Sequence, residues 1–213
     1  MLRVIKNLSL NAFMIGFLPL AGEKDLLVFP RGALGCVDMN AELKGESDKL
    51  LRLSSMTADK KCACVLNADF KAGAGLFNSA AVIEEGEIVG VSDEISPKAH
   101  DAGSALRCYE LKEGRVGILL GDDLLFPELW SRLAFCAPSL ILCLGSYRAE
   151  LYPALSRLCD CAVCAVSKER TGIYAQGALI KSSFEDILSL PLPKSRRRPA
   201  VLTKKVKTSI ERT

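Results

Sequence analysis

The sequence predicts a layered α/β protein with a single folded domain. Short apolar runs typical of buried strands alternate along the chain with amphipathic segments of helical spacing. A chain of 213 residues can bury a sizeable core without disulfides or metals. Its 49% hydrophobic and 25% charged residues exclude a disordered chain. We place the folded domain at residues 1–190 and a basic C-terminal tail at residues 191–213.

The most apolar stretch near the start is Leu8–Leu20, which is too short to span a bilayer and contains Asn11 and Pro19. Arg3 and Lys6 precede it, so the segment has a weak likeness to a signal peptide. The residues that follow continue directly into a core pattern. We therefore expect a buried first strand here, in a cytoplasmic protein that does not enter a membrane.

The first half of the chain predicts strands, one helix and two hairpins. Leu26–Phe29 is a continuous apolar run and predicts a fully buried strand. Glu42–Lys60 has apolar residues near helical spacing and predicts a single helix. Two turns place Gly86 and Gly114 where a hairpin needs positive φ. The other strands expected in this half are Cys62–Ala68, Phe77–Ile83, Ile88–Val91, Leu106–Leu111 and Val116–Leu120.

After Gly121 the pattern changes to that of a helix. Asp122 and Asp123 are good N-cap residues, and Pro127 suits the first turn of a helix. The remaining expected elements are strands at Leu140–Leu144, Cys161–Val166 and Tyr174–Ile180, and a helix at Leu151–Leu158.

Nine cysteines are present, an odd number that leaves at least one unpaired. The cluster Cys159, Cys161 and Cys164 suggests metal ligation, but zinc sites normally use paired C-x2-C knuckles in loops. Here the spacing suits one face of a strand, where a thiol behaves as a small hydrophobe. We expect neither a metal nor any other cofactor.

The basic residues gather at the C-terminal end. From Lys194 onward eight residues are basic and one is acidic, a net charge of +7 against −4 for the rest of the chain. Such a tail can touch anionic partners. It has no aromatic residue to stack on a base, so we expect a solvated terminus and not a nucleic-acid-binding segment.

Five short segments occur in a characteristic order along the chain, namely Asp25–Pro30 with Gly32–Leu34, Leu76–Ala80, Gly114–Ile118, Asp123–Glu128 and Ala137–Ser146. Together they resemble the carbon–nitrogen hydrolases of the nitrilase superfamily, over a region from about Leu20 to about Ser183. The resemblance implies a four-layer α-β-β-α sandwich and a homodimer formed by packing one helical layer on its copy.

The resemblance also implies that the family's catalytic residues are missing. In that family a cysteine attacks the carbon, a glutamate moves the proton and a lysine stabilises the oxyanion. The glutamate position holds Arg31, the lysine position Glu94 and the cysteine position Gly121. Because glycine has no side chain, the covalent route has no nucleophile.

Two hypotheses follow from these replacements. An acid has become Arg31 and a base has become Glu94, so the two side chains are candidates for a salt bridge across the old site. The alternative is that each lies in solvent or pairs elsewhere. Secondly, backbone amides near Gly121, with Arg31 as a bidentate donor, are candidates for binding a small carboxylate or phosphate.

Other residues are candidates for the same cavity. Cys36 is a possible substitute nucleophile, although its neighbours offer no obvious base. His100, the only histidine, falls in an expected loop, and we interpret it as solvent-exposed and not catalytic. Asp122 and Asp123 form a carboxylate pair that suits a divalent ion, but helix capping is the simpler interpretation.

The function expected from the sequence is that of a degenerate carbon–nitrogen hydrolase acting by binding or assembly, with a small anionic or amide ligand. The alternative is a hydrolase of amide or nitrile bonds that uses a non-standard catalytic residue. Fold alone does not decide between these two functions.

Overall fold

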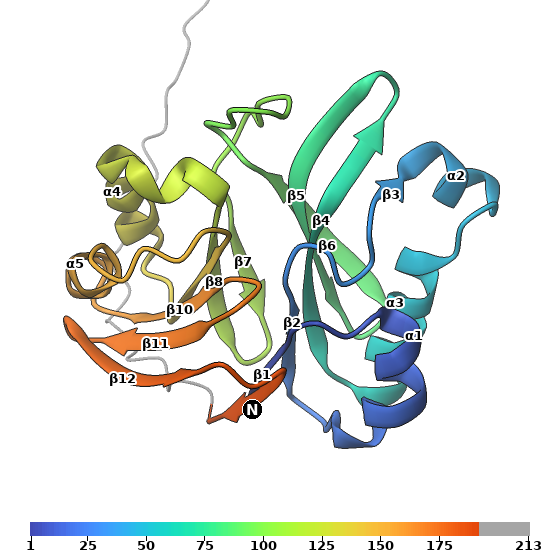
Figure 1. Ribbon diagram of the computed structural model, residues 1–213, viewed down its shortest axis with the longest axis horizontal. Coiled ribbons are helices and arrows are strands. Elements are labelled where there is room, and N and C mark those ends of the chain that lie inside the picture. Colours follow the sequence, from blue (N-terminus) through green and yellow to red (C-terminus); the bar gives the residue numbers. More distant parts are fainter. Residues whose placement is uncertain (192–213) are drawn as a thin grey trace, which may run out of the picture.

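A computed structural model describes residues 1–191 of the chain and has four layers, α-β-β-α. Two β-sheets face each other in the middle, and helices cover their outer faces (Figure 1). The expected sandwich is therefore confirmed. The predicted tail and any binding of nucleic acid by it lie outside the described residues, apart from Pro191. Within residues 1–191, no helix has both the length and the apolar character that a bilayer span needs.

The first sheet has seven strands in the order β13-β1-β2-β4-β5-β6, with β3 paired to the end of β4. Strands β1, β2 and β4 run parallel, and the others on this path are antiparallel to their neighbours. The bounds are β1 Leu2–Ile5, β2 Leu26–Phe29, β3 Val37–Asp38, β4 Ala63–Ala72, β5 Gly75–Glu84, β6 Glu87–Asp93 and β13 Ile187–Leu190.

The second sheet has six strands in the order β12-β11-β10-β9-β8-β7. Strands β8, β9 and β10 run parallel at its centre, and hairpins form both edges. The bounds are β7 Cys108–Leu111, β8 Gly114–Leu120, β9 Leu140–Leu144, β10 Ala162–Val166, β11 Thr171–Ala175 and β12 Ala178–Ser183. The parallel strands of each sheet end close together, which positions several loops around one crevice.

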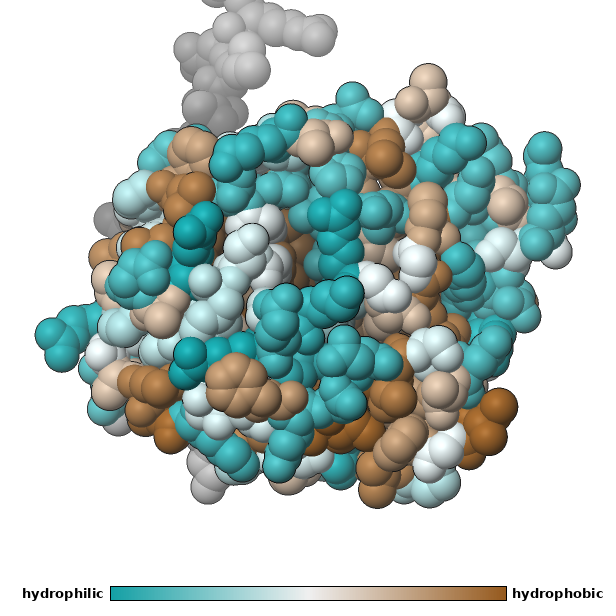
Figure 2. Space-filling model, viewed as in Figure 1, coloured by the Kyte–Doolittle hydropathy of each residue, from teal (hydrophilic) through white to brown (hydrophobic). Residues whose placement is uncertain are grey.

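Three apolar clusters hold the layers together. The inner faces of the two sheets pack on each other through residues such as Val28, Val65, Ile118 and Leu142. The outer face of the first sheet packs against α1 (Leu10–Ala12) and α3 (Lys49–Lys60), and that of the second against α4 (Pro127–Cys136) and α5 (Tyr152–Leu158). In the view of Figure 2 hydrophilic side chains gather over the middle of the face, with hydrophobic ones along its lower edge.

The expected first strand at Leu8–Leu20 is wrong. The first strand is β1, and Leu8–Leu20 instead contains α1, a π-helical segment at Phe13–Phe17 and a 3₁₀ turn at Leu18–Leu20. Ser9 caps this segment by accepting a hydrogen bond from the Ala12 amide. The apolar residues of the segment cover the outer face of the first sheet, so their burial does not require strand pairing.

The single helix expected at Glu42–Lys60 is two helices, α2 (Met39–Lys44) and α3. Gly45 ends α2 in the left-handed conformation with φ +73°. The Glu42 carboxyl then accepts hydrogen bonds from the Lys49 and Leu50 amides at 3.1 and 3.0 Å, which caps the start of α3. Because the chain turns between the helices, Glu42 can reach amides that a continuous helix would bond internally.

Both predicted hairpins are confirmed, and a third hairpin was missed. Gly86 and Gly114 have φ of +95° and +135° in the turns β5–β6 and β7–β8. The strand expected at Tyr174–Ile180 is interrupted by a turn at Gln176 and Gly177, with φ of +53° and +83°, so it belongs to two strands, β11 and β12. Positive φ at both central residues is the geometry that tight hairpins favour.

Candidate functional site

A cavity of about 580 Å³ opens at the ends of the parallel strands. The segments that follow β2, β6, β8, β9 and β10 contribute to its wall, together with side chains of β4 and β5. This is the region of an open α/β layer where ligands usually bind. Five of the six residues predicted for the site line it, namely Arg31, Cys36, Glu94, Gly121 and Asp122. The sixth, Asp123, lies directly behind the wall and is buried.

Gly121 and Glu94 meet at the base of this cavity. Gly121 follows β8 with φ +49°, and a Cβ built on it would clash with Oε1 of Glu94. The amide of the next residue, Asp122, donates to the same oxygen at 2.7 Å. The Glu94 carboxyl therefore fills the space that any side chain at position 121 would need.

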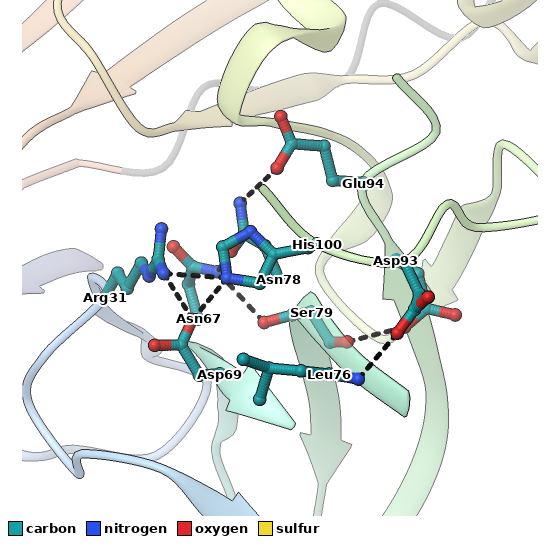
Figure 3. Close-up of polar contacts among 10 residues, drawn as sticks. Arg31, Asn67, Asp69, Leu76, Asn78, Ser79, Asp93, Glu94 and His100 are labelled. Atoms are coloured by element: carbon teal, nitrogen blue, oxygen red, sulfur yellow. Dashed lines mark hydrogen bonds and ion pairs between the residues drawn. The ribbon is translucent and has the colours of Figure 1, made fainter. Parts of the chain in front are cut away.

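A chain of buried amides fixes the other oxygen of Glu94 (Figure 3). The side-chain nitrogen of Asn78 donates to Oε2 of Glu94 at 2.8 Å. Asn67 donates to the Asn78 side-chain oxygen at 2.8 Å and to the Ser79 carbonyl at 2.9 Å. Because Glu94 can only accept here, it determines which way each of the two asparagine amides points.

The predicted salt bridge between Arg31 and Glu94 is wrong. Arg31 pairs with Asp69 at 2.6 Å, and its guanidinium also lies 2.9 Å from Nε2 of His100. These three residues form a group on the cavity rim, away from Glu94 (Figure 3). Arg31 therefore finds its counter-ion on β4, and the loop beyond β6 supplies the imidazole.

His100 lies in a loop, as expected, but the prediction that its side chain is solvent-exposed is wrong. Only 10% of the side chain is accessible, and Nε2 also lies 3.3 Å from Oδ1 of Asp69. The loop between β6 and β7 folds back over the cavity and places this ring in the wall.

The predicted helix-capping role of Asp122 and Asp123 is also wrong. The residues from Gly121 to Leu125 form a 3₁₀ turn without a side-chain cap. Helix α4 begins later, at Pro127, again without a side-chain cap. Asp122 instead pairs with Lys98 at 2.8 Å, on the loop that carries His100.

Asp123 fastens the segment after Glu94 to the segment after Gly121. Its Oδ1 accepts hydrogen bonds from the Ile95 and Ser96 amides, each at 2.9 Å. Burial, with a smaller contribution from the nearby Glu94, raises the pKa of Asp123 to about 6 against the lowering effect of the amide bonds. The carboxyls of Asp122 and Asp123 thus serve separate partners. Within residues 1–191 no three His, Cys, Asp or Glu side chains gather as a metal site.

The cysteines lie apart from the base of the cavity. All nine are free, and Cys36 is the exposed one on the cavity wall. The spacing of Cys159, Cys161 and Cys164 predicted that they share one face of a strand, and this prediction is wrong. Cys159 caps the C-terminal end of α5, Cys161 precedes β10, and only Cys164 lies within β10. Burial raises the pKa of Cys164 to about 12, so this thiol remains protonated.

The hydrogen bonds at Gly121 argue against the hypothesis that an anion binds there. The Asp122 amide, which that hypothesis needs, already donates to Glu94.

The sequence did not indicate Asn67 as a residue of the site. The available signal was an amide side chain within the apolar run Cys62–Ala68, since a buried polar group in a strand needs a specific partner.

No family model matches the sequence, and a comparison with curated proteins found no match. Solved structures do match the fold. Nit3 of Saccharomyces cerevisiae, a member of branch 10 of the nitrilase superfamily, has a TM-score of 0.70 and 15% identity, covering 97% of this chain and 96% of that chain. XC1258 from Xanthomonas campestris, a CN-hydrolase superfamily protein, has a TM-score of 0.66 and 17% identity, covering 88% of both chains.

An amidase from Nesterenkonia sp. is similar to the same extent. Its TM-score is 0.70 with 15% identity, covering 93% of both chains. These matches cover 88–97% of this chain. This protein therefore has the carbon–nitrogen hydrolase fold of the nitrilase superfamily.

Proposed function

We propose that the chain is a divergent carbon–nitrogen hydrolase-like protein that has no amidase or nitrilase activity and acts by binding or assembly. The observation that carries this proposal is the contact between Gly121 and Glu94. A Cβ at position 121 would clash with the Glu94 carboxyl, so the place that the family resemblance assigns to a nucleophilic thiol is filled by a carboxyl group.

The chemistry of the replaced residues supports the same conclusion. Removing a general base lowers the rate by about 10²–10⁴, and removing one oxyanion donor lowers it by about 10²–10³. Where the hydrolytic mechanism of the resembled family requires an oxyanion-stabilising ammonium, this cavity has the acceptor Glu94, which would repel a developing oxyanion. Without a sulfur atom at position 121, no acyl-enzyme can form there.

The cavity itself favours a binding function. At about 580 Å³ it falls within the range of about 300–1,000 Å³ typical of small-molecule sites. Its base is built from buried polar side chains that hydrogen-bond to one another, namely Asn67, Asn78 and Glu94. Such a base holds a fixed shape before a ligand arrives, which reduces the entropy lost on binding.

The alternative function is hydrolysis of an amide or nitrile by a different residue. Its support is that the Cys36 thiol and the His100 ring line one cavity. A thiol with an adjacent base is the usual requirement for such a nucleophile.

An assay of ammonia release separates the two functions. The full chain is incubated with acetamide, butyramide, benzamide and propionitrile, beside its Cys36→Ser variant. We expect no ammonia above the buffer level from either protein. In parallel, alkylation by iodoacetamide should modify Cys36 no faster than a free thiol in solution. Ammonia release that Cys36→Ser abolishes would establish the alternative, and release that survives the substitution would also refute the proposal.

A further inference from the structure

We propose that the cavity binds its ligand through a cationic nitrogen group, an amidinium or an ammonium, seated on the Glu94 carboxyl. This inference rests on the proposed function, because it requires a binding cavity and not a hydrolytic site. The ligand class follows from the buried charges of the cavity and from the free hydrogen-bonding positions of Glu94.

Glu94 is a buried acid whose hydrogen-bond donors are all neutral groups. Only 5% of the residue is exposed, and its oxygens accept from the Asn78 side chain and the Asp122 amide. No Lys, Arg or His of residues 1–191 lies within ion-pair distance of it. Buried carboxylates normally have a cationic partner or a metal, because desolvation of the charge is otherwise unfavourable by several kcal/mol. A ligand cation would supply the missing counter-ion.

The other charges of the wall are already matched. Arg31 pairs with Asp69, and Lys98 pairs with Asp122. The remaining charged residues of the lining, Lys168 and Glu169, are exposed to solvent, where an ion pair with a ligand contributes little. A ligand anion would therefore find its donors taken, whereas a ligand cation finds one buried acceptor at the base.

The hydrogen bonds of Glu94 leave room for a second pair of donors. A carboxylate accepts at about four lone-pair positions, and only two are used here. Two parallel N–H groups of an amidinium or guanidinium match a carboxylate in a bidentate arrangement. The fixed amides of Asn67 and Asn78 prevent the carboxyl from turning away, so the acceptor is already oriented.

The Asp123 carboxyl also makes the base of the cavity favourable for a cation. Asp123 lies close enough behind Glu94 for the two carboxyls to interact, which contributes to the raised pKa of Asp123. Two acids so near each other favour a positive group between the base of the cavity and solvent.

Three probes of one shape test the ligand class. Benzamidine, benzamide and benzoate share a phenyl ring and differ in the charge of the head group. Binding to the full chain is measured by ligand-observed NMR titration at pH 7. We expect benzamidine to bind about tenfold or more tightly than benzamide, and benzoate to bind most weakly. Equal affinities, tighter binding of benzoate or no binding of benzamidine would overturn the proposal, whether or not any variant folds.

Substitutions then locate the probe. Glu94→Gln keeps the shape and should weaken benzamidine by about tenfold or more while changing benzamide by less than about threefold. Glu150→Gln, at an exposed position outside the cavity lining, is the matched control and should leave both affinities within about threefold. An unchanged affinity for benzamidine in Glu94→Gln would overturn the assignment of the cation to this carboxyl.

A second cavity must be excluded, because it too has an acidic rim. It measures about 330 Å³, lies near the β5–β6 and β7–β8 turns, and includes Glu84, Glu85 and Glu113 in its wall. Glu113→Gln should not change benzamidine binding. If it weakens benzamidine and Glu94→Gln does not, the cation sits in that cavity and the inference is wrong.

The test also distinguishes failure of this inference from failure of the proposed function. Conversion of benzamide to benzoate and ammonia would show that the protein is a hydrolase, whatever the order of the affinities. An intact benzamide together with preferred binding of benzoate would leave the non-hydrolytic function standing and remove only the cationic ligand.

Discussion

At the scale of single residues, Gly121 is subject to two separate constraints. Its φ of +49° is unfavourable for residues with a Cβ, and the Glu94 carboxyl fills the adjacent space. We predict that Gly121→Ala lowers the free energy of unfolding by about 2–4 kcal/mol, because Glu94 must give up its bonds to Asn78 and the Asp122 amide. Urea denaturation at pH 7 measures this loss.

A double substitution separates the two constraints. In a Glu94→Ala background the space is open, so Gly121→Ala should cost only the backbone strain of about 1–2 kcal/mol. Equal losses in the two backgrounds would show that the carboxyl does not restrict position 121. Because Glu94→Ala opens the space beside position 121, a thiol can be reintroduced at position 121 in that background.

The contribution of Asp123 to folding stability depends on pH. Its pKa rises from 3.8 to about 6 on folding, so between these values the folded state binds more protons than the unfolded state. The contribution of this group to stability therefore falls as the pH rises from about 4 to 6, and the full penalty, about 3 kcal/mol, remains above pH 6.

Asp123→Asn should remove this dependence, since the asparagine oxygen can still accept from the Ile95 and Ser96 amides. We predict that the variant gains stability relative to the natural chain as the pH increases from 4 to 6, by up to about 3 kcal/mol. Urea denaturation across this range checks the difference. A constant difference at every pH would show that the carboxyl keeps its ordinary pKa.

The sequence predicts which residues line the site, but not which residues they pair with. The sequence placed Glu94, Gly121 and Arg31 around one cavity, and the structure brings all three there. It did not reveal that Arg31 meets Asp69, because Asp69 directly follows the expected strand Cys62–Ala68 and no pattern marks it as a counter-ion. Pairing of a loop residue with a strand depends on how the loop folds back, and hydrophobic periodicity does not report this.

At the scale of elements, the break between α2 and α3 is set by Glu42. This side chain leaves the last turn of α2 and accepts from the Lys49 and Leu50 amides at the start of α3. Asp48, the residue before α3, makes no side-chain cap. We predict that Glu42→Ala destabilises the protein by about 1–2 kcal/mol, because two amides at a helix N-terminus lose an acceptor.

Glu46→Ala is the matched control, since Glu46 lies exposed between the same two helices. It should change stability by less than about 0.5 kcal/mol. Urea denaturation of the three proteins gives the comparison, and hydrogen exchange at the start of α3 should accelerate only in Glu42→Ala. Similar losses in the two variants would rule out the cap.

The elements that could be predicted are those with a short-range cause. The run Leu26–Phe29 forms β2, and the turns with Gly86 and Gly114 form hairpins, because apolar runs and turn residues act locally. The break at Gly45 was hidden, since the residues on both sides continue a helical pattern. The turn at Gln176 and Gly177 was also missed, because glutamine is not a residue that usually marks a tight turn.

At the scale of the whole molecule, the four layers leave two helical faces toward solvent, and each exposes large hydrophobic side chains. The layer of α4 and α5 exposes Phe135 by 91% and Leu158 by 51%. Exposed large side chains grouped on one face are typical of an interaction surface. We propose that a second copy of the chain packs on this layer, which agrees with the homodimer expected from the resemblance.

The dimer has a direct test in the molar mass in solution. Light scattering during size-exclusion chromatography should give twice the 23.0 kDa of one chain. Phe135→Asp should shift the protein to a single chain, because a buried charge on the interface is unfavourable by several kcal/mol. Leu43→Asp is the control, since Leu43 is 81% exposed on α2 in the opposite layer, and it should leave the mass unchanged. A natural chain that elutes as one copy at high concentration, or a dimer broken only by Leu43→Asp, would place association elsewhere or remove it.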